Sequence, residues 1–322
     1  MRRILITGGS GFIGTNLVEH FRAEGAALLN LDTRPPRNRA HAPCWRKMDI
    51  LDAGSVKDAF KEFSPTHLVH MAARTDLGGR TIGDYAANTA GLANVIDAAA
   101  NEHGLRRLVF GSSMLVCRVG YLPAGPTDYA PSTAYGESKV AGEKLLRSAD
   151  LGDKCWTLVR PTSIWGPWFG EPYADFFHAV LKRRFVKFSG AAAATKTFGY
   201  VGNTVLQIDA LLRAPEGAVH GRMFYLGDAP PLNVERWADT IAELARVGKP
   251  RRVPLTLVKA AARLGDALQA AGIRAPMTSF RLTNMTTDNI VDLSPIGALA
   301  GAPCFALEAG VTRTLEWMRS IR

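Results

Sequence analysis

Residues 3–14 read RILITGGSGFIG, an apolar run followed by three glycines at G-x-x-G-x-x-G spacing. The run predicts a buried strand over 3–7, and the amphipathic stretch over 12–24 predicts a helix directly behind it. Gly8, Gly11 and Gly14 have no Cβ, so the turn can be tight and its backbone N–H groups can contact a pyrophosphate. The motif therefore predicts a dinucleotide site, with a glycine turn of purely structural purpose as the alternative.

An acidic residue follows the glycine motif at the spacing that a dinucleotide site requires. Asp32 lies 18 residues beyond Gly14, at the end of a second apolar run over 27–31. A carboxylate there can accept hydrogen bonds from both hydroxyls of an adenosine ribose. Because it would repel a 2′-phosphate, we expect NAD rather than NADP as the cofactor. Arg34 and Arg37 follow closely, and they are either ligands for that phosphate or solvated loop residues.

Strands and helices alternate through the first half of the chain. Apolar runs predict strands over 68–71, 107–110 and 156–159, and helices are expected over 85–101 and from about 133. Strands this apolar need helices on both faces. The pattern therefore predicts the α/β class, with a doubly wound parallel sheet of the Rossmann type.

The alternation loosens after Gly166, where prolines and glycines interrupt it. We therefore expect an NAD-binding domain over 1–165 and a smaller mixed α/β substrate-binding domain over 166–322. Segments near 196–225 and 286–294 are again strand-like or helix-like, and they are expected to return to the first domain.

Composition limits the class of protein and its partners. The 322 residues are 47% hydrophobic and 21% charged, as in folded chains, and contain no apolar run of 18 residues. A net charge of +10 favours an anionic partner. The basic clusters are short and lack an aromatic RNA-binding signature, so we expect no nucleic-acid and no membrane partner. A phosphate-bearing small molecule explains the charge, and a solvated basic surface without a ligand is the alternative. The four cysteines lack metal-ligand or redox spacing, so we expect reduced thiols, no metal and a cytoplasmic location.

Candidate reaction chemistry lies further along the chain. Tyr135 and Lys139 are four residues apart on a predicted helix, so both side chains emerge on one face. A neighbouring ammonium favours the phenolate and can bring a tyrosine within reach of general-base chemistry. Ser112 and Ser113 follow a strand at its carboxyl end, where ligands of open α/β sheets bind. A chance pair on a helix surface and a serine that simply ends a strand are the structural alternatives.

Together these motifs resemble those of the extended short-chain dehydrogenase/reductases, in particular the branch of nucleotide-sugar epimerases and dehydratases. The resemblance covers most of the chain, and the motifs occur in the family's order at residues 7–14, Asp32, 48–50, 70–73, Ser112-Ser113, 135–139, Arg160-Pro161, 196–201 and 292–294. It implies NAD as cofactor, a nucleotide-sugar substrate and a homodimer built through the helices at 85–101 and 133–148.

The resemblance also implies roles for individual residues. Tyr135 would be the base, Lys139 would bind the nicotinamide ribose and lower the pKa of Tyr135, and Ser113 would be the catalytic serine. Helix packing or capping is the alternative role for Asn88. The implied cofactor-binding residues are Gly8, Gly11, Phe12, Ile13, Asp32, Asp49, Ile50, Met71, Ala72, Ala73, Asn88 and Lys139. The implied substrate-binding residues are Ser163, Lys196 and Arg281.

Departures from the family's motifs narrow the expected activity. Dehydratases have Thr-Asp-Glu at the active-site turn, where this chain has Ser113-Met114-Leu115, so elimination of water lacks its acid and base. We expect a nucleotide-sugar epimerase that forms a transient keto sugar by Tyr-assisted hydride transfer. The alternatives are a keto-sugar reductase or dehydrogenase and a non-catalytic dinucleotide-binding regulator. Ser163, Lys196 and Pro295 replace the usual asparagine, arginine and lysine, so the motifs do not name the sugar or the nucleotide.

Overall fold

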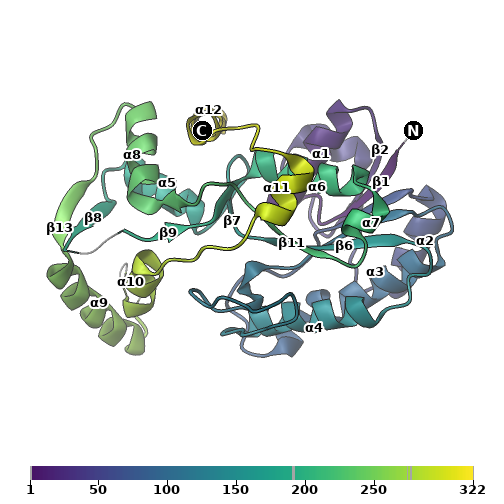
Figure 1. The fold of residues 1–322 in the computed structure, drawn as a ribbon, viewed down its shortest axis with the longest axis horizontal. Helices are drawn as coiled ribbons and strands as arrows, with labels where there is room; N and C mark the ends of the chain where they lie inside the picture. The colour runs from purple at the N-terminus through teal and green to yellow at the C-terminus, as the bar shows by residue number, and fades with distance from the viewer. Residues whose placement is uncertain (1, 191–192, 274, 276–277, 322) are drawn as a thin grey trace.

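A seven-stranded parallel sheet forms the centre of the fold (Figure 1). The computed structural model describes residues 2–190, 193–273, 275 and 278–321. The strands lie in the order β11-β6-β5-β4-β1-β2-β3, which confirms the predicted doubly wound sheet. Their bounds are β1 Arg3–Thr7, β2 Ala27–Asp32, β3 Trp45–Lys47, β4 His67–His70, β5 Arg107–Gly111, β6 Cys155–Pro161 and β11 Met223–Leu226.

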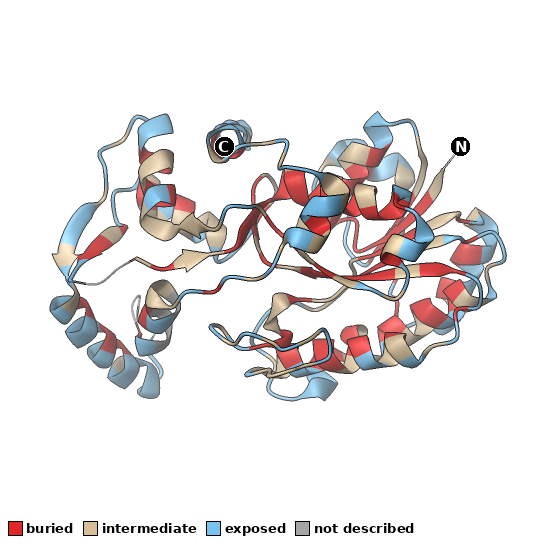
Figure 2. Ribbon diagram, viewed as in Figure 1, coloured by how far each residue is buried: buried red, intermediate tan, exposed pale blue. Residues whose placement is uncertain are grey.

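Helices cover both faces of the sheet. Successive residues of a strand point to opposite faces, so each strand contributes apolar side chains to both helix layers. Leu5 and Leu68 pack with α2, α3 and α4, whereas Ile4 and Ile6 pack with α1, α6 and α11 on the other face. Figure 2 shows buried residues along the strands and on the helix sides turned toward them. The helix bounds are α1 Phe12–Ala23, α2 Ala53–Phe63, α3 Ala90–Asn101, α4 Ala134–Ser148, α6 Val201–Arg213, α7 Glu216–Val219 and α11 Ser294–Ala300.

The helix predicted over 85–101 is broken, which corrects that prediction. A 3-10 helix, η2 (Ile82–Asn88), precedes α3, and Thr89 between them has a non-helical backbone (φ −121°, ψ −78°). The side-chain amide of Asn88 bonds to both backbone groups of Arg74, at 2.9 and 3.0 Å. Such tertiary contacts outweigh the helix propensity of the surrounding alanines. The prediction also omitted β3, α2 and two 3-10 helices, η1 (Arg39–Cys44) and η3 (Met114–Val116).

The rest of the chain builds three two-stranded sheets around an aromatic core. β7 pairs with β10, β8 with β13 and β9 with β12. Trp165 and Trp237 are buried in this core, with ring centroids 5.2 Å apart. The element bounds are β7 Ser163–Trp165, α5 Tyr173–Leu181, β8 Val186–Ser189, β9 Thr195–Lys196, β10 Phe198–Tyr200, β12 Leu232–Asn233, α8 Val234–Leu244, β13 Arg251–Pro254, α9 Leu255–Ala270, α10 Ser279–Thr286 and α12 Leu307–Ser320.

Residues from the second half of the chain complete the central sheet. β11 pairs with β6 in parallel, with Leu226 opposite Pro161, and α6 covers the sheet face beside α1. α11 packs against α6 and β11. The edge strand of the central sheet, β11, therefore follows β7, β9 and β10 of the smaller sheets in the sequence.

Candidate active site

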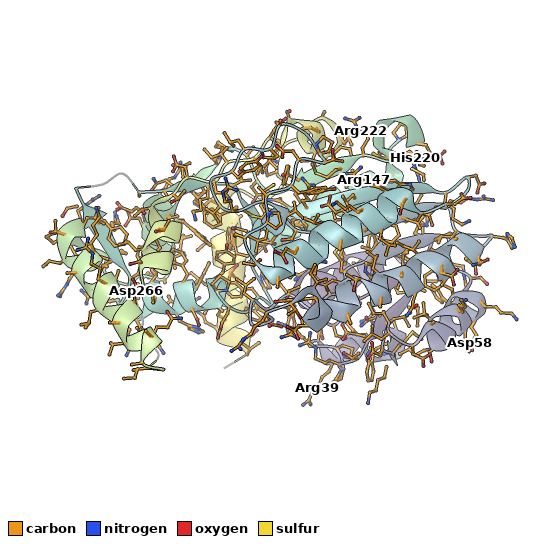
Figure 3. The ribbon with its side chains drawn as sticks, turned by 90° about the horizontal axis from the view of Figure 1, so that it is seen from below. Arg39, Asp58, Arg147, His220, Arg222 and Asp266 are labelled. Atoms are coloured by element: carbon orange, nitrogen blue, oxygen red, sulfur yellow. The ribbon has the colours of Figure 1, made fainter. Side chains whose placement is uncertain are left out.

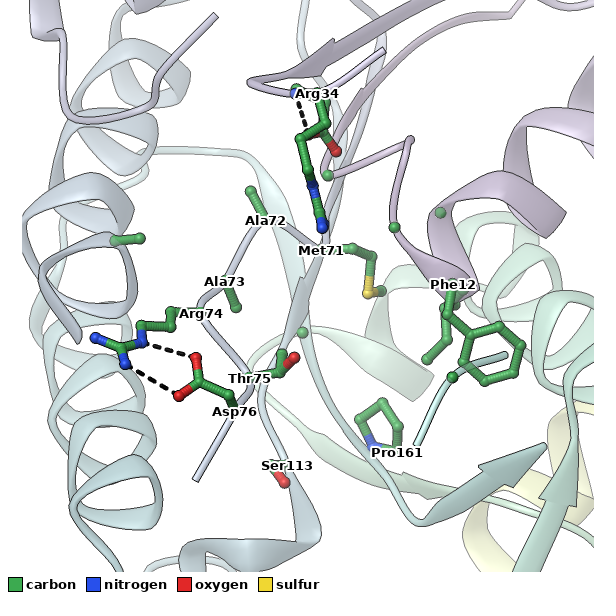
Figure 4. A pocket seen from close by; sticks show the side chains of 18 of the residues that line it. Phe12, Arg34, Met71, Ala72, Ala73, Arg74, Thr75, Asp76, Ser113 and Pro161 are labelled. Carbon is green, nitrogen blue, oxygen red and sulfur yellow. Dashed lines mark hydrogen bonds and ion pairs between the residues drawn. The ribbon is translucent and has the colours of Figure 1, made fainter. Parts of the chain in front are cut away.

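A cleft of about 800 Å³ lies at the carboxyl ends of the sheet strands (Figure 4). Asp32 ends β2, Met71 follows β4, Gly111 ends β5 and Pro161 ends β6, and all four line the cleft. Its walls contain most of the residues that the sequence implied for cofactor and reaction, namely Gly8, Gly11, Phe12, Ile13, Asp32, Asp49, Ile50, Met71, Ala72, Ala73, Ser113, Tyr135 and Lys139.

The glycine turn forms one end of the cleft. Gly8 has φ +77°, and a Cβ on it would lie 2.5 Å from the backbone nitrogen of Ala72. A Cβ on Gly14 would lie 2.1 Å from the Gly8 carbonyl oxygen, so only glycine lets α1 pack against the turn. Phe12 and Ile13 open α1 and line the cleft, and no side chain in the described part of the chain caps this helix terminus. Its N–H groups and partial positive charge suit a pyrophosphate.

Asp32 is held in a fixed orientation beside the glycine turn. Its carboxylate accepts hydrogen bonds from the backbone N–H groups of Ser10 and Arg34, both at 3.0 Å. Each oxygen keeps a further lone pair for a ribose hydroxyl. Arg37 also lines this end of the cleft; burial and the neighbouring Arg34 lower the pKa of Arg37, and its guanidinium donates to the Trp168 carbonyl.

The structure brings Ser113, Tyr135 and Lys139 together. α4 begins behind Thr133, whose hydroxyl accepts from the Gly136 N–H at 3.0 Å, and this cap places Tyr135 in the first turn and Lys139 in the second. The Ser113 hydroxyl hydrogen-bonds to the Tyr135 hydroxyl. Two hydroxyls therefore meet in the wall of the same cleft as the glycine turn.

Burial dominates the protonation of the reaction residues. It raises the pKa of Tyr135, and the hydrogen bond from Ser113 offsets part of the rise. It lowers the pKa of Lys139 to about 8, with the Glu143 carboxylate acting in the opposite direction. Burial therefore outweighs any lowering of the Tyr135 pKa by Lys139, whose ammonium donates to the Gly111 carbonyl at 3.0 Å. At neutral pH Tyr135 is a phenol and Lys139 is charged.

A buried ion pair behind these residues was missed by the sequence interpretation. Arg160 donates to both carboxylate oxygens of Glu143 at 2.8 Å, and both side chains are fully buried. Glu143 also accepts from the Ser112 hydroxyl at 2.6 Å and from the Tyr129 hydroxyl at 3.0 Å. The pair therefore joins α4 to β6 and to the end of β5. The sequence offered one signal for this pair: Glu143 lies four residues after Lys139, on the same face of the predicted helix.

Asn88 is not among the described residues that line the cleft. Besides its two bonds to the backbone of Arg74, its amide donates to the Ser138 hydroxyl at 2.9 Å. Ser138 in turn donates to the Tyr135 carbonyl at 2.7 Å. In this structure Asn88 thus has the packing role, connecting the segment after β4 to the helix that carries Tyr135.

Residues 169–173 form a further wall of the cleft, which the sequence motifs did not mark. In the sequence, these residues are marked only by their position just after Gly166, where the alternation of strands and helices loosens. Ser163 and Lys196 are not found among the cleft-lining residues described: the Ser163 hydroxyl bonds to Tyr173, and Lys196 lies on β9, where burial lowers its pKa. Arg281 lies on α10, and its side chain is outside the described residues.

The residues that line the cleft fit the predicted dinucleotide. A helix N-terminus over a glycine turn suits a pyrophosphate, and the oriented Asp32 carboxylate suits an adenosine ribose. From there the same cleft continues to the Ser113 and Tyr135 hydroxyls. Such a site, at the carboxyl end of a doubly wound sheet, defines a dinucleotide-dependent enzyme of the short-chain dehydrogenase/reductase type.

The chain belongs to the NAD-dependent epimerase/dehydratase family, whose sequence pattern matches residues 4–227. Membership confirms the predicted resemblance, the prediction of an enzyme and NAD as its cofactor. In the part of the chain that the structure describes, no helix combines the length and apolar content needed to cross a bilayer.

Two relatives show the range of activities in this family. A UDP-glucose 4-epimerase of Mycolicibacterium smegmatis is 27% identical over 341 residues, covering 99% of each chain. A 3 beta-hydroxysteroid dehydrogenase/Delta 5→4-isomerase of Mycobacterium tuberculosis is 29% identical over 257 residues, covering 75% of this chain and 69% of the relative. Among solved structures, the Bordetella bronchiseptica enzyme WbmG in complex with NAD and UDP is similar with a TM-score of 0.73 and 25% identity, covering 99% of this chain and 96% of that one.

Proposed function

We propose that the protein is an NAD-dependent nucleotide-sugar epimerase that acts through a transient keto sugar. The observation that carries this proposal is the hydroxyl pair of Ser113 and Tyr135, set in the same cleft as the glycine turn and Asp32. A non-catalytic dinucleotide-binding regulator would have no need of this pair.

The residues of the chain divide the chemistry between them. When bound, NAD would supply the hydride-transfer chemistry at the sugar carbon. In the oxidising step the phenolate form of Tyr135 accepts the proton of the sugar hydroxyl, while Ser113 holds the sugar oxygen by a hydrogen bond. The Lys139 ammonium, one helical turn further along α4, would favour that phenolate. After the keto sugar has rotated in the cleft, Tyr135 gives the proton back to the oxygen and the carbon is reduced from its other face. Lys139, charged at neutral pH, would hold the nicotinamide ribose.

Several features support a nucleotide sugar as the substrate. The +10 net charge favours an anionic ligand, and the UDP-glucose 4-epimerase relative aligns over nearly the whole chain. We assign the sugar to the wall formed by residues 169–173 and keep Lys196, Arg281 and Ser163 as the proposed contacts of the nucleotide. In this scheme 166–322 is the substrate-binding domain, and 1–165 with its return segments is the NAD-binding domain.

The proposal includes an assembly and a location. α3 and α4 would form the interface of a homodimer, as the family resemblance implies, and the enzyme would act in the cytoplasm. Size-exclusion chromatography with light scattering tests the dimer, because a monomer at micromolar concentration would exclude that interface.

A reductase or dehydrogenase of the same family is the second candidate. It is favoured by the hydroxysteroid dehydrogenase relative and by the raised pKa of Tyr135, because a phenol protonated at neutral pH donates readily to a ketone. Such an enzyme would exchange its cofactor at each turnover.

The testing experiment has two stages. The purified protein is denatured, and the released small molecules are identified by ultraviolet spectrum and mass. The intact protein is then incubated with UDP-sugars, and inversion of a stereocentre is followed by NMR. Retained NAD with inversion supports the epimerase. An absence of inversion, with steady oxidation of NADH by a keto substrate, would replace the proposal with the reductase.

A further inference from the structure

Tyr85 is a fully buried tyrosine that contacts the candidate active site from behind. It lies in η2 and is not among the described residues that line the cleft. Its ring packs against the ring of Tyr135, with the centroids 5.9 Å apart and the planes tilted by 56°. Tilted contacts of this kind are favourable for aromatic pairs. A residue behind the cleft therefore helps to set the position of the Tyr135 ring.

The Tyr85 hydroxyl holds a different part of the site. Residues 74–76 line the cleft, and we call them the 74–76 wall. The hydroxyl donates to the carbonyl of Asp76 at 2.8 Å and accepts from the N–H of Gly79 at 3.1 Å. Because both bonds are to the backbone, they fix the course of the chain where this wall ends.

Arg74, the first residue of the wall, is held from the same 3-10 helix. Its guanidinium lies over the Tyr85 ring, 5.0 Å from the centroid, and donates to the Asp84 carbonyl at 2.8 Å. It also donates to both carboxylate oxygens of Asp76, at 2.7 and 3.0 Å (Figure 4). Tyr85 thus contacts both ends of the 74–76 wall as well as the Tyr135 ring.

The Tyr85 ring is packed directly against the backbone of Gly79. A Cβ on Gly79 would lie 2.5 Å from Cε2 of Tyr85 and 2.9 Å from its hydroxyl oxygen. Only glycine permits such a close approach of the chain to the ring. A shift of the ring therefore shifts the segment, and a shift of the segment moves the ring.

The 74–76 wall lies at the reaction end of the cleft. In Figure 4 its labelled side chains lie toward Ser113 and away from Arg34, which follows the ribose-binding Asp32. A substrate that reaches the Ser113 and Tyr135 hydroxyls in this cleft would therefore pass beside the wall.

We propose that Tyr85 is a positioning residue, which sets the distance between the Tyr135 hydroxyl and the 74–76 wall. The inference rests on the proposed function, and it holds equally for the reductase, because both need the Tyr135 hydroxyl at the reacting oxygen. The ring of Tyr85 would keep that hydroxyl in place, where a small displacement costs much of the rate. The hydroxyl of Tyr85 would keep the wall in place, where it contributes to binding of the substrate.

Two substitutions of Tyr85 separate these contributions, measured in whichever of the two reactions the wild-type protein performs. Tyr85→Phe keeps the ring and loses both backbone bonds, so KM should rise about fivefold or more while kcat stays within about twofold. Tyr85→Leu also loses the ring, so kcat should fall about tenfold or more. A smaller folded fraction would lower kcat and leave KM unchanged, so it cannot produce the result expected for Tyr85→Phe.

Gly79→Ala disturbs the same contact without removing any atom of Tyr85. Its Cβ would push against the ring, so KM should rise as in Tyr85→Phe. The matched control is Gly83→Ala in η2, whose Cβ would lie at an ordinary contact distance of 3.6 Å. Tyr121→Phe is a second control, because it removes a hydroxyl that is also hydrogen-bonded but lies outside the described cleft wall. Both controls should keep kcat and KM within about twofold.

The outcomes decide the inference separately from the proposed function. A normal KM in Tyr85→Phe and in Gly79→Ala, or equal losses of kcat in Tyr85→Phe and Tyr85→Leu, overturns it. If the wild-type protein performs neither reaction, the proposed function fails, and hydrogen exchange of residues 76–79 decides the inference. Faster exchange there in Tyr85→Phe than in the wild type supports the hold on the wall, and equal exchange overturns it.

Discussion

Glu143 and Arg160 form a two-point ion pair at 2.8 Å with neither side chain exposed to solvent. Glu143 is one turn beyond Lys139 on α4, and Arg160 is near the end of β6. Since the Ser112 hydroxyl also bonds to Glu143, the pair fixes the backbone on both sides of the reaction residues. Loss of this ion pair is therefore expected to lower the stability of the fold directly and to reduce turnover only through the position of the reaction residues.

Glu143→Gln should lower the free energy of unfolding by about 3–5 kcal/mol, because the Arg160 charge stays buried without its partner. The double variant Glu143→Met/Arg160→Met should lose no more than the single variant, since it removes both charges. Urea unfolding measures both. In the control, Glu62→Gln in the exposed Arg46–Glu62 pair should cost less than about 1 kcal/mol. Additive losses in the double variant would refute the coupling.

Tyr135→Phe should reduce turnover at least about a hundredfold, because it removes the hydroxyl that exchanges a proton with the substrate. The affinity for NAD, measured by calorimetry, should stay within about twofold, as the ring and its packing remain. Tyr121→Phe is the matched control, since that hydroxyl bonds to Asp128 and lies outside the cleft wall. Normal turnover in the Tyr135 variant would remove Tyr135 from the reaction.

Asp32→Ala should weaken NAD binding about tenfold or more and NADP binding much less. The reason is that the carboxylate accepts from the ribose hydroxyls of NAD and repels the 2′-phosphate of NADP. Fluorescence titration with both cofactors measures the ratio. Asp58→Ala, on the exposed side of α2 (Figure 3), should leave both affinities unchanged. Equal losses for the two cofactors would contradict the assignment.

Lys139→Met should stabilise the protein near neutral pH while abolishing turnover. Folding lowers the pKa of Lys139 from its ordinary 10.5 to about 8, so the unfolded state binds more protons between these values. The destabilising effect of the buried charge is therefore full below about pH 8 and disappears as the pH rises toward 10.5. The gain near pH 7 is at most about 3 kcal/mol, less about 1 kcal/mol for the lost bond to Gly111.

Urea unfolding at a series of pH values checks this prediction. The advantage of Lys139→Met over the wild type should shrink between about pH 8 and 10.5. Lys144→Met removes an exposed lysine from the same helix as a control, and its effect on stability should be small. A constant advantage for the Lys139 variant would show that packing, not charge, is responsible.

The residues that the sequence marked for the cofactor lie together in one cleft, apart from Asn88, and the signals that marked them are local. The glycine spacing, the carboxylate after a strand and the four-residue interval between Tyr135 and Lys139 each need only one strand or one helix. The Glu143–Arg160 pair could not be predicted in the same way, since it forms only when β6 is laid beside α4. The break at Thr89 has the same origin: the Asn88 contacts that cause it reach a segment 14 residues away.

The lateness of β11 in the sequence also has a consequence for synthesis. The chain leaves the ribosome from its N-terminus, so β6 emerges well before the strand that covers its outer edge. Until β11 has emerged, the outer edge of β6 presents unpaired backbone groups. Such an edge can accept a strand from another chain. The interval between synthesis of β6 and of β11 is thus the one in which this edge is open to wrong pairing, for a reason set by connectivity and not by the stability of the finished fold.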